Sequence, residues 1–219
     1  MDTRSIEFGG VVIQAPVTAG TNLLLAVQCA VYCARLRTDT EARPRLWAGF
    51  FAMMSLATLA GVLKHGMRDT LPESVFLGVL WISSVTGGVS TYYAQLATIR
   101  SHAGAAMARV LSRAALVQLV GFLAASAALG PEMTLLIADT AIGLLPVIWF
   151  EARGCPEGGL VAIGLAVSIG TAAVYHSGLS VGPWLNHIDI AHVLMGVSFL
   201  LIARGARADT STPGGAPWS

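Results

Sequence analysis

Charged residues are scarce in this chain. Of its 219 residues only 11% are Asp, Glu, Lys or Arg, whereas 55% are hydrophobic. A water-soluble domain of this length cannot bury so large an apolar surface. The composition therefore excludes an ordinary soluble domain and predicts an integral membrane protein.

Cysteine and lysine are also rare. Cys29 and Cys33 lie one helical turn apart in the first apolar run and Cys155 lies in a predicted loop, so no disulfide framework is expected. We interpret the first two as packing residues instead of ligands for a soft metal. The near-absence of lysine, with free use of Ala, Gly and Arg, fits a GC-rich bacterial genome and favours a bacterial inner membrane. No phosphate-binding glycine loop, nucleophile elbow or nucleic-acid-binding patch is seen, and no nucleic-acid partner is expected.

Seven long apolar runs dominate the chain. Each approaches the roughly 20 residues that a helix needs to cross about 30 Å of hydrocarbon. We therefore predict an all-α polytopic membrane protein, with a single bundle of seven transmembrane helices over residues 16–204. A short polar segment at 1–15 and a flexible tail at 205–219 flank it. The runs are 16–36, 47–67, 75–96, 110–129, 133–150, 159–175 and 187–203.

The basic residues predict the orientation of the bundle, because lysine and arginine near span ends favour the cytoplasm. Arg4, Lys64 and Arg68 fall on one side. The others fall on the opposite side: Arg35, Arg37, Arg43, Arg45, Arg100, Arg109, Arg113, Arg153, Arg204 and Arg207. We therefore predict an N-terminus outside and a C-terminus in the cytoplasm. The N-terminal segment lacks the pattern of a cleaved signal peptide, so the first span is expected to be retained.

Ionisable residues gather at the predicted outer ends of the spans. His65 closes the second span, and His187, Asp189 and His192 open the last. Asp189 and His192 share one helix face, whereas His187 lies about 140° around the helix from His192. Neutral imidazoles bind zinc, and a catalytic zinc commonly has three protein ligands plus water. We therefore predict a Zn²⁺ site between the second and seventh spans, with ligands drawn from His65, His187, His192 and Asp189.

Simpler interpretations of these polar residues stay open. Histidines near span ends often just lie at the interface, and Lys64 can extend to the headgroups. His176, at the end of the sixth span, is a candidate supporting or entrance residue. Asp139, about 10 Å below the outer end of the fifth span, either serves a site or forms an interhelical hydrogen bond, for example to neighbours of Thr140 or to Gln118 on the fourth span. His102, in a predicted cytoplasmic loop, is expected to be solvated.

A seven-span bundle with one histidine on the second span and two on the seventh resembles the CREST superfamily. That group includes alkaline ceramidases, the adiponectin and progestin receptors and haemolysin III-like proteins. The resemblance covers the topology of the whole chain and is carried by His65 and residues 187–196. It implies a zinc ion held by three histidines and, in active members, hydrolysis of lipid amides. The chain departs from the pattern in its His-x4-His spacing, in Gly61 where the family has serine, and in lacking an aspartate in the third span.

Two hypotheses about function follow. The first is a zinc-dependent membrane hydrolase of a lipid-like amide or ester from the outer leaflet. In it zinc activates water, Asp189 or Asp69 transfers protons, and Lys64 steadies an oxyanion or a headgroup. The second is a non-enzymatic receptor or transporter that uses the same polar cluster to bind a small molecule, a metal or a proton. Membrane lipids are expected partners in both, and the sequence does not indicate an oligomeric state.

Overall fold

The computed structural model describes residues 5–154, 156–182 and 184–207, and this part of the chain contains seven helices. Each is long and apolar enough to cross a membrane. The prediction of an all-α, seven-helix integral membrane protein is therefore confirmed. Of the tail predicted at 205–219, the first three residues belong to the last helix, which ends at Arg207, and the rest lies outside the described residues. The helices are α1 (Pro16–Leu36), α2 (Ala42–Gly66), α3 (Glu73–His102), α4 (Ala105–Leu129), α5 (Met133–Gly154), α6 (Pro156–Ser177) and α7 (His187–Arg207).

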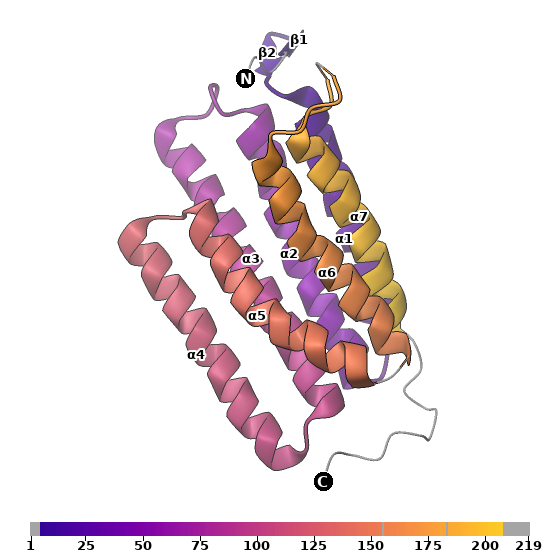
Figure 1. Cartoon of the computed structure of the whole chain (residues 1–219). Coiled ribbons are helices and arrows are strands. Elements are labelled where there is room, and N and C mark those ends of the chain that lie inside the picture. The colour runs from indigo at the N-terminus through magenta and orange to yellow at the C-terminus, as the bar shows by residue number, and fades with distance from the viewer. Residues whose placement is uncertain (1–4, 155, 183, 208–219) are drawn as a thin grey trace.

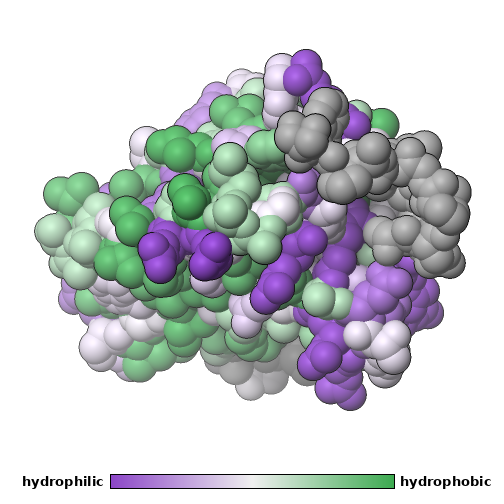
Figure 2. Space-filling model, turned by 90° about the horizontal axis from the view of Figure 1, so that it is seen from below, coloured by the Kyte–Doolittle hydropathy of each residue, from purple (hydrophilic) through white to green (hydrophobic). Residues whose placement is uncertain are grey.

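Successive helices alternate in direction, so the bundle has two distinct ends (Figure 1). The end of α2 with His65 and the start of α7 with His192 lie at the top of Figure 1, which we name the histidine end. The starts of α2 and α4 and the end of α3 lie at the bottom, which we name the arginine end after Arg45, Arg100 and Arg109. Seen from the arginine end, hydrophilic residues are interspersed with hydrophobic ones (Figure 2). The assignment of this end to the cytoplasm stays a prediction.

Several helices extend beyond the apolar runs of the sequence. α2 begins at Ala42 instead of residue 47, α3 continues to His102 beyond residue 96, and α4 begins at Ala105 instead of residue 110. The added turns lie at the arginine end and carry arginines, which lower hydropathy but are good helix formers. The hydropathy of the sequence therefore identified the part of each helix that crosses the hydrocarbon of the membrane. The helices themselves continue beyond that part.

Glycine and proline mark several helix ends. Pro16 occupies the first turn of α1, where its missing N–H costs no helical hydrogen bond. Gly130 caps α4 with φ of 92°, and Gly178 follows α6 with φ of 66°. A positive φ costs glycine little and interrupts a helix. The chain can therefore turn back into the bundle after short connections.

A two-stranded antiparallel hairpin precedes α1, where the sequence predicted only a polar segment. β1 (Ile6–Phe8) pairs with β2 (Val11–Ile13), and Gly9 and Gly10 form the turn with positive φ at both positions. Two consecutive residues with positive φ suit the right-handed twist of a tight hairpin. The hairpin lies at the histidine end (Figure 1).

Gln14 fixes the hairpin to the connection between α2 and α3. Its backbone N–H donates to the carbonyl of Gly66 at 3.0 Å. Its side chain donates to the carboxylate of Asp69 and accepts from the backbone N–H of Asp69. The N-terminal segment is therefore tied to the end of α2.

An aromatic cluster of four side chains fills the centre of the bundle. Trp47, Phe50 and Phe51 from α2 and Phe199 from α7 are all buried. Their contacts are edge to face, with ring centroids 5.1 to 6.2 Å apart. Such pairs add to the stabilisation that comes from burial alone. The aromatic cluster therefore fixes α2 against α7.

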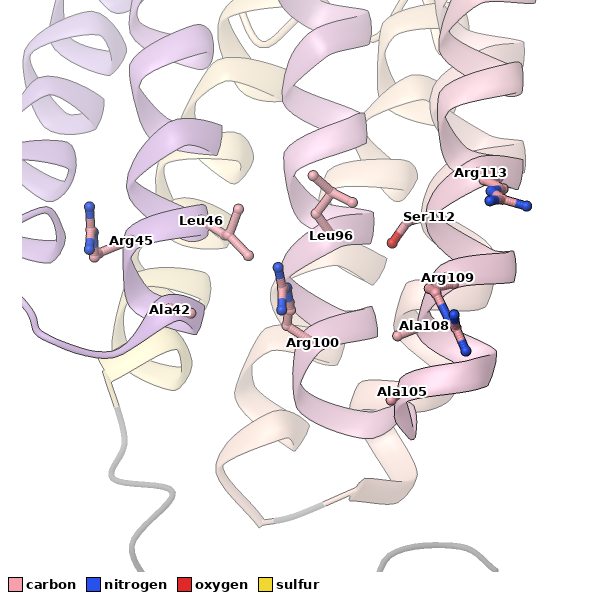
Figure 3. A pocket seen from close by; sticks show the side chains of 10 residues that line it. All are labelled: Ala42, Arg45, Leu46, Leu96, Arg100, Ala105, Ala108, Arg109, Ser112 and Arg113. Carbon is pink, nitrogen blue, oxygen red and sulfur yellow. The ribbon is translucent and has the colours of Figure 1, made fainter.

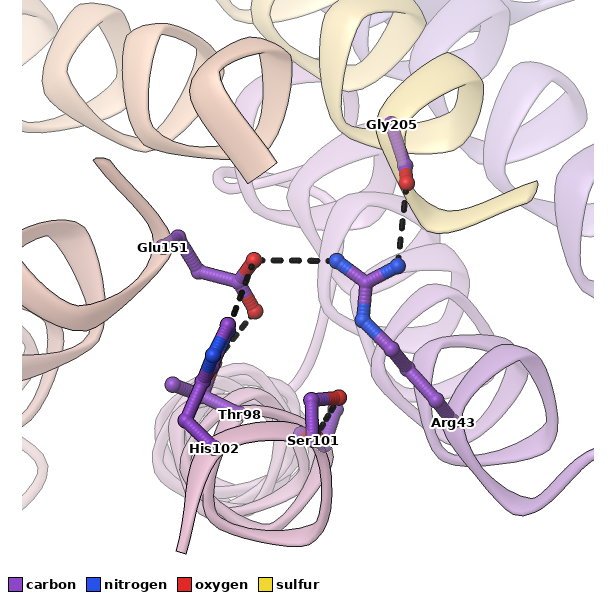
Figure 4. Close-up of polar contacts among 7 residues, drawn as sticks. Arg43, Thr98, Ser101, His102, Glu151 and Gly205 are labelled. Carbon is purple, nitrogen blue, oxygen red and sulfur yellow. Dashed lines mark hydrogen bonds and ion pairs between the residues drawn. The ribbon is translucent and has the colours of Figure 1, made fainter. Parts of the chain in front are cut away.

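A buried ion pair joins four helices at the arginine end (Figure 4). Arg43 Nη2 donates to Glu151 Oε2 at 2.9 Å, and Arg43 Nη1 donates to the carbonyl of Gly205 at 3.1 Å. Thr98 donates to the second Glu151 oxygen at 2.8 Å, and His102 Nε2 lies 3.5 Å from Oε2. The interpretation of His102 as a solvated loop residue is wrong, because α3 continues far enough to carry its ring to Glu151.

A second polar cluster joins α3, α4 and α5 within the membrane. Gln118 Nε2 donates at 2.9 Å to both the carboxylate and the carbonyl of Asp139, and Gln95 Nε2 donates to Gln118 at 2.8 Å. An isolated carboxylate at this depth would be costly. The interhelical hydrogen bond between Asp139 and Gln118 that the sequence suggested is confirmed.

Candidate ligand-binding site

The start of α7 is fixed by a reciprocal cap. The side-chain oxygen of Asn186 accepts from the backbone N–H groups of Ile188 at 2.8 Å and Asp189 at 3.3 Å. In return, Asp189 Oδ2 accepts from the backbone N–H of Asn186 at 3.0 Å. This exchange satisfies N–H groups that a helix start leaves unpaired. It explains why the helix begins at His187.

Asp189 is a positioning residue in this structure. Its side chain is fully buried, and its second carboxylate oxygen accepts from Thr18 Oγ1 on α1 at 2.7 Å. Both oxygens are thus hydrogen-bonded to the protein, and Asp189 does not line the cavity described below. The geometry gives it a role in holding α7 against α1, whereas its predicted roles as a zinc ligand and a proton carrier stay predictions.

His65 and His192 meet at the histidine end. Their ring centroids are 6.4 Å apart at an interplanar angle of 71°. Thr21 on α1 donates to the carbonyl of Thr18 at 3.0 Å and contacts His192 Nδ1 at 2.8 Å. That hydroxyl has a single proton, and which atom donates at the second contact depends on the tautomer of His192. His192 Nε2 has no hydrogen-bond partner within the described residues.

Lys64 lies beside this pair of histidines. Within the described part of the chain, neither its ammonium nor the ring of His65 has a hydrogen-bond or ion-pair partner. Both side chains are half-buried and line an internal cavity together with His192. The site therefore presents the ammonium of Lys64, the imidazole of His65 and the Nε2 atom of His192, none of which has a hydrogen-bond partner within the described residues.

The two other histidines of this end lie apart from the pair. The His187 ring packs against Tyr175 on α6, with centroids 5.9 Å apart. His176 contacts the same tyrosine at 5.2 Å and is exposed. Neither histidine lines the cavity. His187 points away because five residues separate it from His192, which is about 140° around a helix.

Asp69 lies outside the cavity as well. It is exposed in the connection between α2 and α3, and its carboxylate accepts from Gln14. This places it with the N-terminal hairpin. Its predicted role as a proton carrier has no geometric support from this position.

The structure brings together two of the four predicted zinc ligands. Among residues 5–154, 156–182 and 184–207, no group of three or more His, Cys, Asp or Glu side chains is arranged to hold a metal ion. A catalytic zinc commonly has three protein ligands. His65 and His192 alone therefore do not match such a site, although Thr21 orients His192 as residues near metal sites often orient a ligand.

An internal cavity of about 270 Å³ extends from these residues into the bundle. Six of the helices line it, all except α4. Along α2 its lining runs from His65 to Phe50, which is about 20 Å at 1.5 Å per residue. On α5 and α7 the lining residues nearest the arginine end are Leu144 and Phe199. Part of the aromatic cluster thus forms the floor of the cavity.

Most hydroxyls along the cavity are already satisfied within the bundle. Thr58 and Ser90 donate to carbonyls of their own helices at 2.8 and 2.6 Å, and Thr171 does so at 2.6 Å. Such back-bonding leaves the methyl and methylene groups to face the cavity. The body of the cavity is therefore mainly apolar, and its basic side chains, Lys64, His65 and His192, lie together at the histidine end.

The contribution of α1 to the candidate site was not predicted from the sequence. Asn22 is buried, lines the cavity and donates to the carbonyl of Thr18 at 3.0 Å. A β-carbon placed on Gly61 would overlap the side-chain oxygen of Asn22. The absence of a side chain at Gly61 therefore leaves space for the side-chain amide of Asn22. A signal was present, because Thr18, Thr21 and Asn22 recur at helical spacing in the first span.

A family model matches residues 17–211 and describes a family of unknown function, DUF6962. The chain belongs to DUF6962. No curated protein and no solved structure matches it. The match covers all seven helices of this DUF6962 protein, so the cavity lies within the region that defines the family.

Proposed function

We propose that this DUF6962 protein binds an amphipathic, lipid-like molecule inside the bundle. Its apolar part lies along the cavity toward Phe50 and Phe199, and its polar head lies between Lys64, His65 and His192. One observation carries this proposal: an apolar cavity ends at a cation that has no partner within the described residues.

The chemistry of that end favours an anionic or strongly accepting head. An ammonium group held within a membrane bundle is costly unless an acceptor meets it. Lys64 offers three donors, and the His65 imidazole, which has no hydrogen-bond partner within the described residues, can donate one more. A carboxylate or phosphate head would satisfy these donors together. A ligand without such a head would leave Lys64 unpaired.

The test is a comparison of palmitate with hexadecanol, which share a chain and differ in the charge of the head. Binding is measured by native mass spectrometry of the full-length protein in detergent. We expect the wild type to prefer palmitate and Lys64→Met to lose about tenfold in palmitate affinity. Arg68→Met is the matched control, since this exposed cation of the same end lies over Phe76 and does not line the cavity.

A second substitution tests the apolar body of the cavity. Ala57 lines it, and Ala57→Trp would fill much of the space. We expect this variant to lose both ligands, provided that its thermal unfolding matches the wild type. Palmitate affinity that stays unchanged in both Lys64→Met and Ala57→Trp would contradict the proposal.

A second candidate function is the zinc-dependent hydrolysis of a lipid-like amide or ester. The contact of Thr21 with His192 favours it, because it leaves His192 Nε2 free beside His65. Elemental analysis of protein purified without chelator tests it. Near-stoichiometric zinc in the wild type that disappears in His65→Ala and in His192→Ala would support it. A wild type that takes up no zinc even when zinc is supplied would exclude it.

A further inference from the structure

A second hollow opens at the arginine end, between the starts of α2 and α4 and the end of α3. Its volume is about 870 Å³, and none of its lining residues lines the ligand cavity. We name it the arginine groove. Its principal residues are Arg45, Leu46, Leu96, Arg100, Arg109 and Arg113.

Four guanidinium groups surround the arginine groove from three helices. Arg45 lies in the first turn of α2 and Arg100 in the last turn of α3. Arg109 and Arg113, four residues apart, share one face of α4. All four are exposed, no acidic residue lines the groove, and none of the four has an ion-pair partner within the described residues. The charge of the groove is therefore not compensated by an ion pair with any of the described residues.

The surface between the arginines is apolar. Leu46 and Leu96 point toward one another from α2 and α3, and Ser112 faces this gap from α4 (Figure 3). Arg100 lies about 3 Å before the end of α3, whereas Arg113 lies about 12 Å inside α4. Arg45, Arg100 and Arg109 thus lie within about 6 Å of the helix ends, whereas Leu46 and Leu96 lie about 6 and 9 Å inside, and Arg113 lies deepest. A headgroup held by the first three arginines leaves its acyl chain beside the leucines.

The wall that α4 forms is open. The first buried residue of α4 is Ala115, and it is followed only by Phe122 and Ser126. The first turns of α4, which line the groove, therefore have no packed neighbour on their outer side. A lipid can approach the groove laterally from the membrane.

We propose that the arginine groove binds the headgroup of an anionic phospholipid of the adjacent leaflet. The phosphodiester lies between the guanidiniums, and an acyl chain lies along Leu46 and Leu96. The planar fork of arginine suits phosphate oxygens, and basic pockets between helices recognise such headgroups. A free phosphate has the same charge but no chain to cover the leucines, so the apolar surface favours the lipid.

The test uses the full-length protein in detergent and native mass spectrometry. Phosphatidylglycerol, phosphatidylcholine with the same chains, and glycerol 3-phosphate are titrated in parallel. The groove variant carries Arg100→Gln, Arg109→Gln and Arg113→Gln. The control variant carries Arg35→Gln, Arg37→Gln and Arg204→Gln. It loses the same charge from exposed positions at the same end, outside the groove.

We expect phosphatidylglycerol to bind the wild type and the control alike, and to bind the groove variant about tenfold more weakly or worse. Phosphatidylcholine and glycerol 3-phosphate should bind weakly to all three proteins. Equal losses in the groove and control variants would overturn the proposal, as would glycerol 3-phosphate binding as tightly as the lipid. A groove variant that keeps its lipid but changes oligomeric mass would assign the groove to contact between copies. If the groove variant does not fold, Arg109→Gln alone is measured, with a smaller loss expected and no loss overturning the proposal.

Discussion

At the scale of single residues, the contact between Asn22 and Gly61 decides how closely α1 approaches α2. Asn22 is buried, and its side-chain oxygen occupies the position that a side chain at residue 61 would take. The amide belongs to the ligand cavity, so packing and binding depend on the same pair. Because protein interiors are close-packed, even one added carbon atom forces neighbouring atoms to move.

Gly61→Ala is therefore expected to lower the free energy of unfolding by about 1–3 kcal/mol, although alanine favours helices. Equilibrium unfolding in detergent measures this loss. The matched control is Gly78→Ala on α3, where an added β-carbon meets nothing within 4 Å. Combining Gly61→Ala with Asn22→Ala should restore much of the loss. A Gly61→Ala variant as stable as Gly78→Ala would contradict this contact.

Asp189 offers a second prediction at this scale. Asp189→Ala leaves the Thr18 hydroxyl and the Asn186 N–H without their acceptors. Each buried group that loses its partner costs about 1–3 kcal/mol, so a clear drop in thermal stability is expected. Asp69→Ala removes an exposed carboxylate and should change stability far less. Equal melting temperatures for the two variants would argue against the capping role of Asp189.

The candidate site shows what spacing predicts and what it leaves open. His65 and His192 come together as the sequence predicted, because both lie at the same end of antiparallel spans. Spacing also indicated that His187 lies on another face of α7. It does not show how each helix is rotated against its neighbours, and this rotation turns His187 to Tyr175 and Asp189 to Thr18.

At the scale of helices, the ion pair of Arg43 with Glu151 joins elements that are distant in sequence. It links α2 to α5 directly and reaches α7 through the carbonyl of Gly205 and α3 through Thr98. Glu151 is fully buried and Arg43 is nearly so. In the sequence, Arg43 served only to predict the orientation of the bundle. Local sequence patterns do not indicate that it pairs with Glu151, which lies 108 residues away.

Glu151→Ala leaves the guanidinium of Arg43 buried without its counter-charge. We expect a loss of about 3–5 kcal/mol in the free energy of unfolding. Glu73→Ala, an exposed carboxylate at the start of α3, serves as the control. The double variant Arg43→Leu with Glu151→Leu should be more stable than Glu151→Ala, since it removes both charges together. A double variant that is the less stable of the two would show that the ion pair itself stabilises the bundle.

Helices and hairpin differ in how far the sequence predicts them. All seven helices were predicted, because each must carry enough apolar residues to cross the hydrocarbon. The hairpin was missed, because two three-residue strands leave too short a pattern to be distinguished from a polar segment. What holds the hairpin is the contact of Gln14 with Gly66 and Asp69, which only the folded chain creates.

At the scale of the whole molecule, the charges of the two ends predict one orientation in the membrane. The arginine end should face the cytoplasm, since basic residues near span ends are retained there. A C-terminal fusion to a reporter that is active only in the cytoplasm should therefore be active, and a fusion to a reporter that needs export should be inactive. The reverse pattern would place the ligand cavity on the cytoplasmic side.

The position of the aromatic floor has a consequence for permeation. Phe50, Phe199 and Leu144 end the cavity, and about one turn beyond Phe50 on α2 lies Trp47, which is completely buried. Next on α2 comes Arg43, paired with Glu151. A solute that enters from the histidine end therefore meets a layer of packed aromatic side chains and then the buried ion pair. Passage from one end of the bundle to the other through this conformation would require these aromatic side chains to move apart.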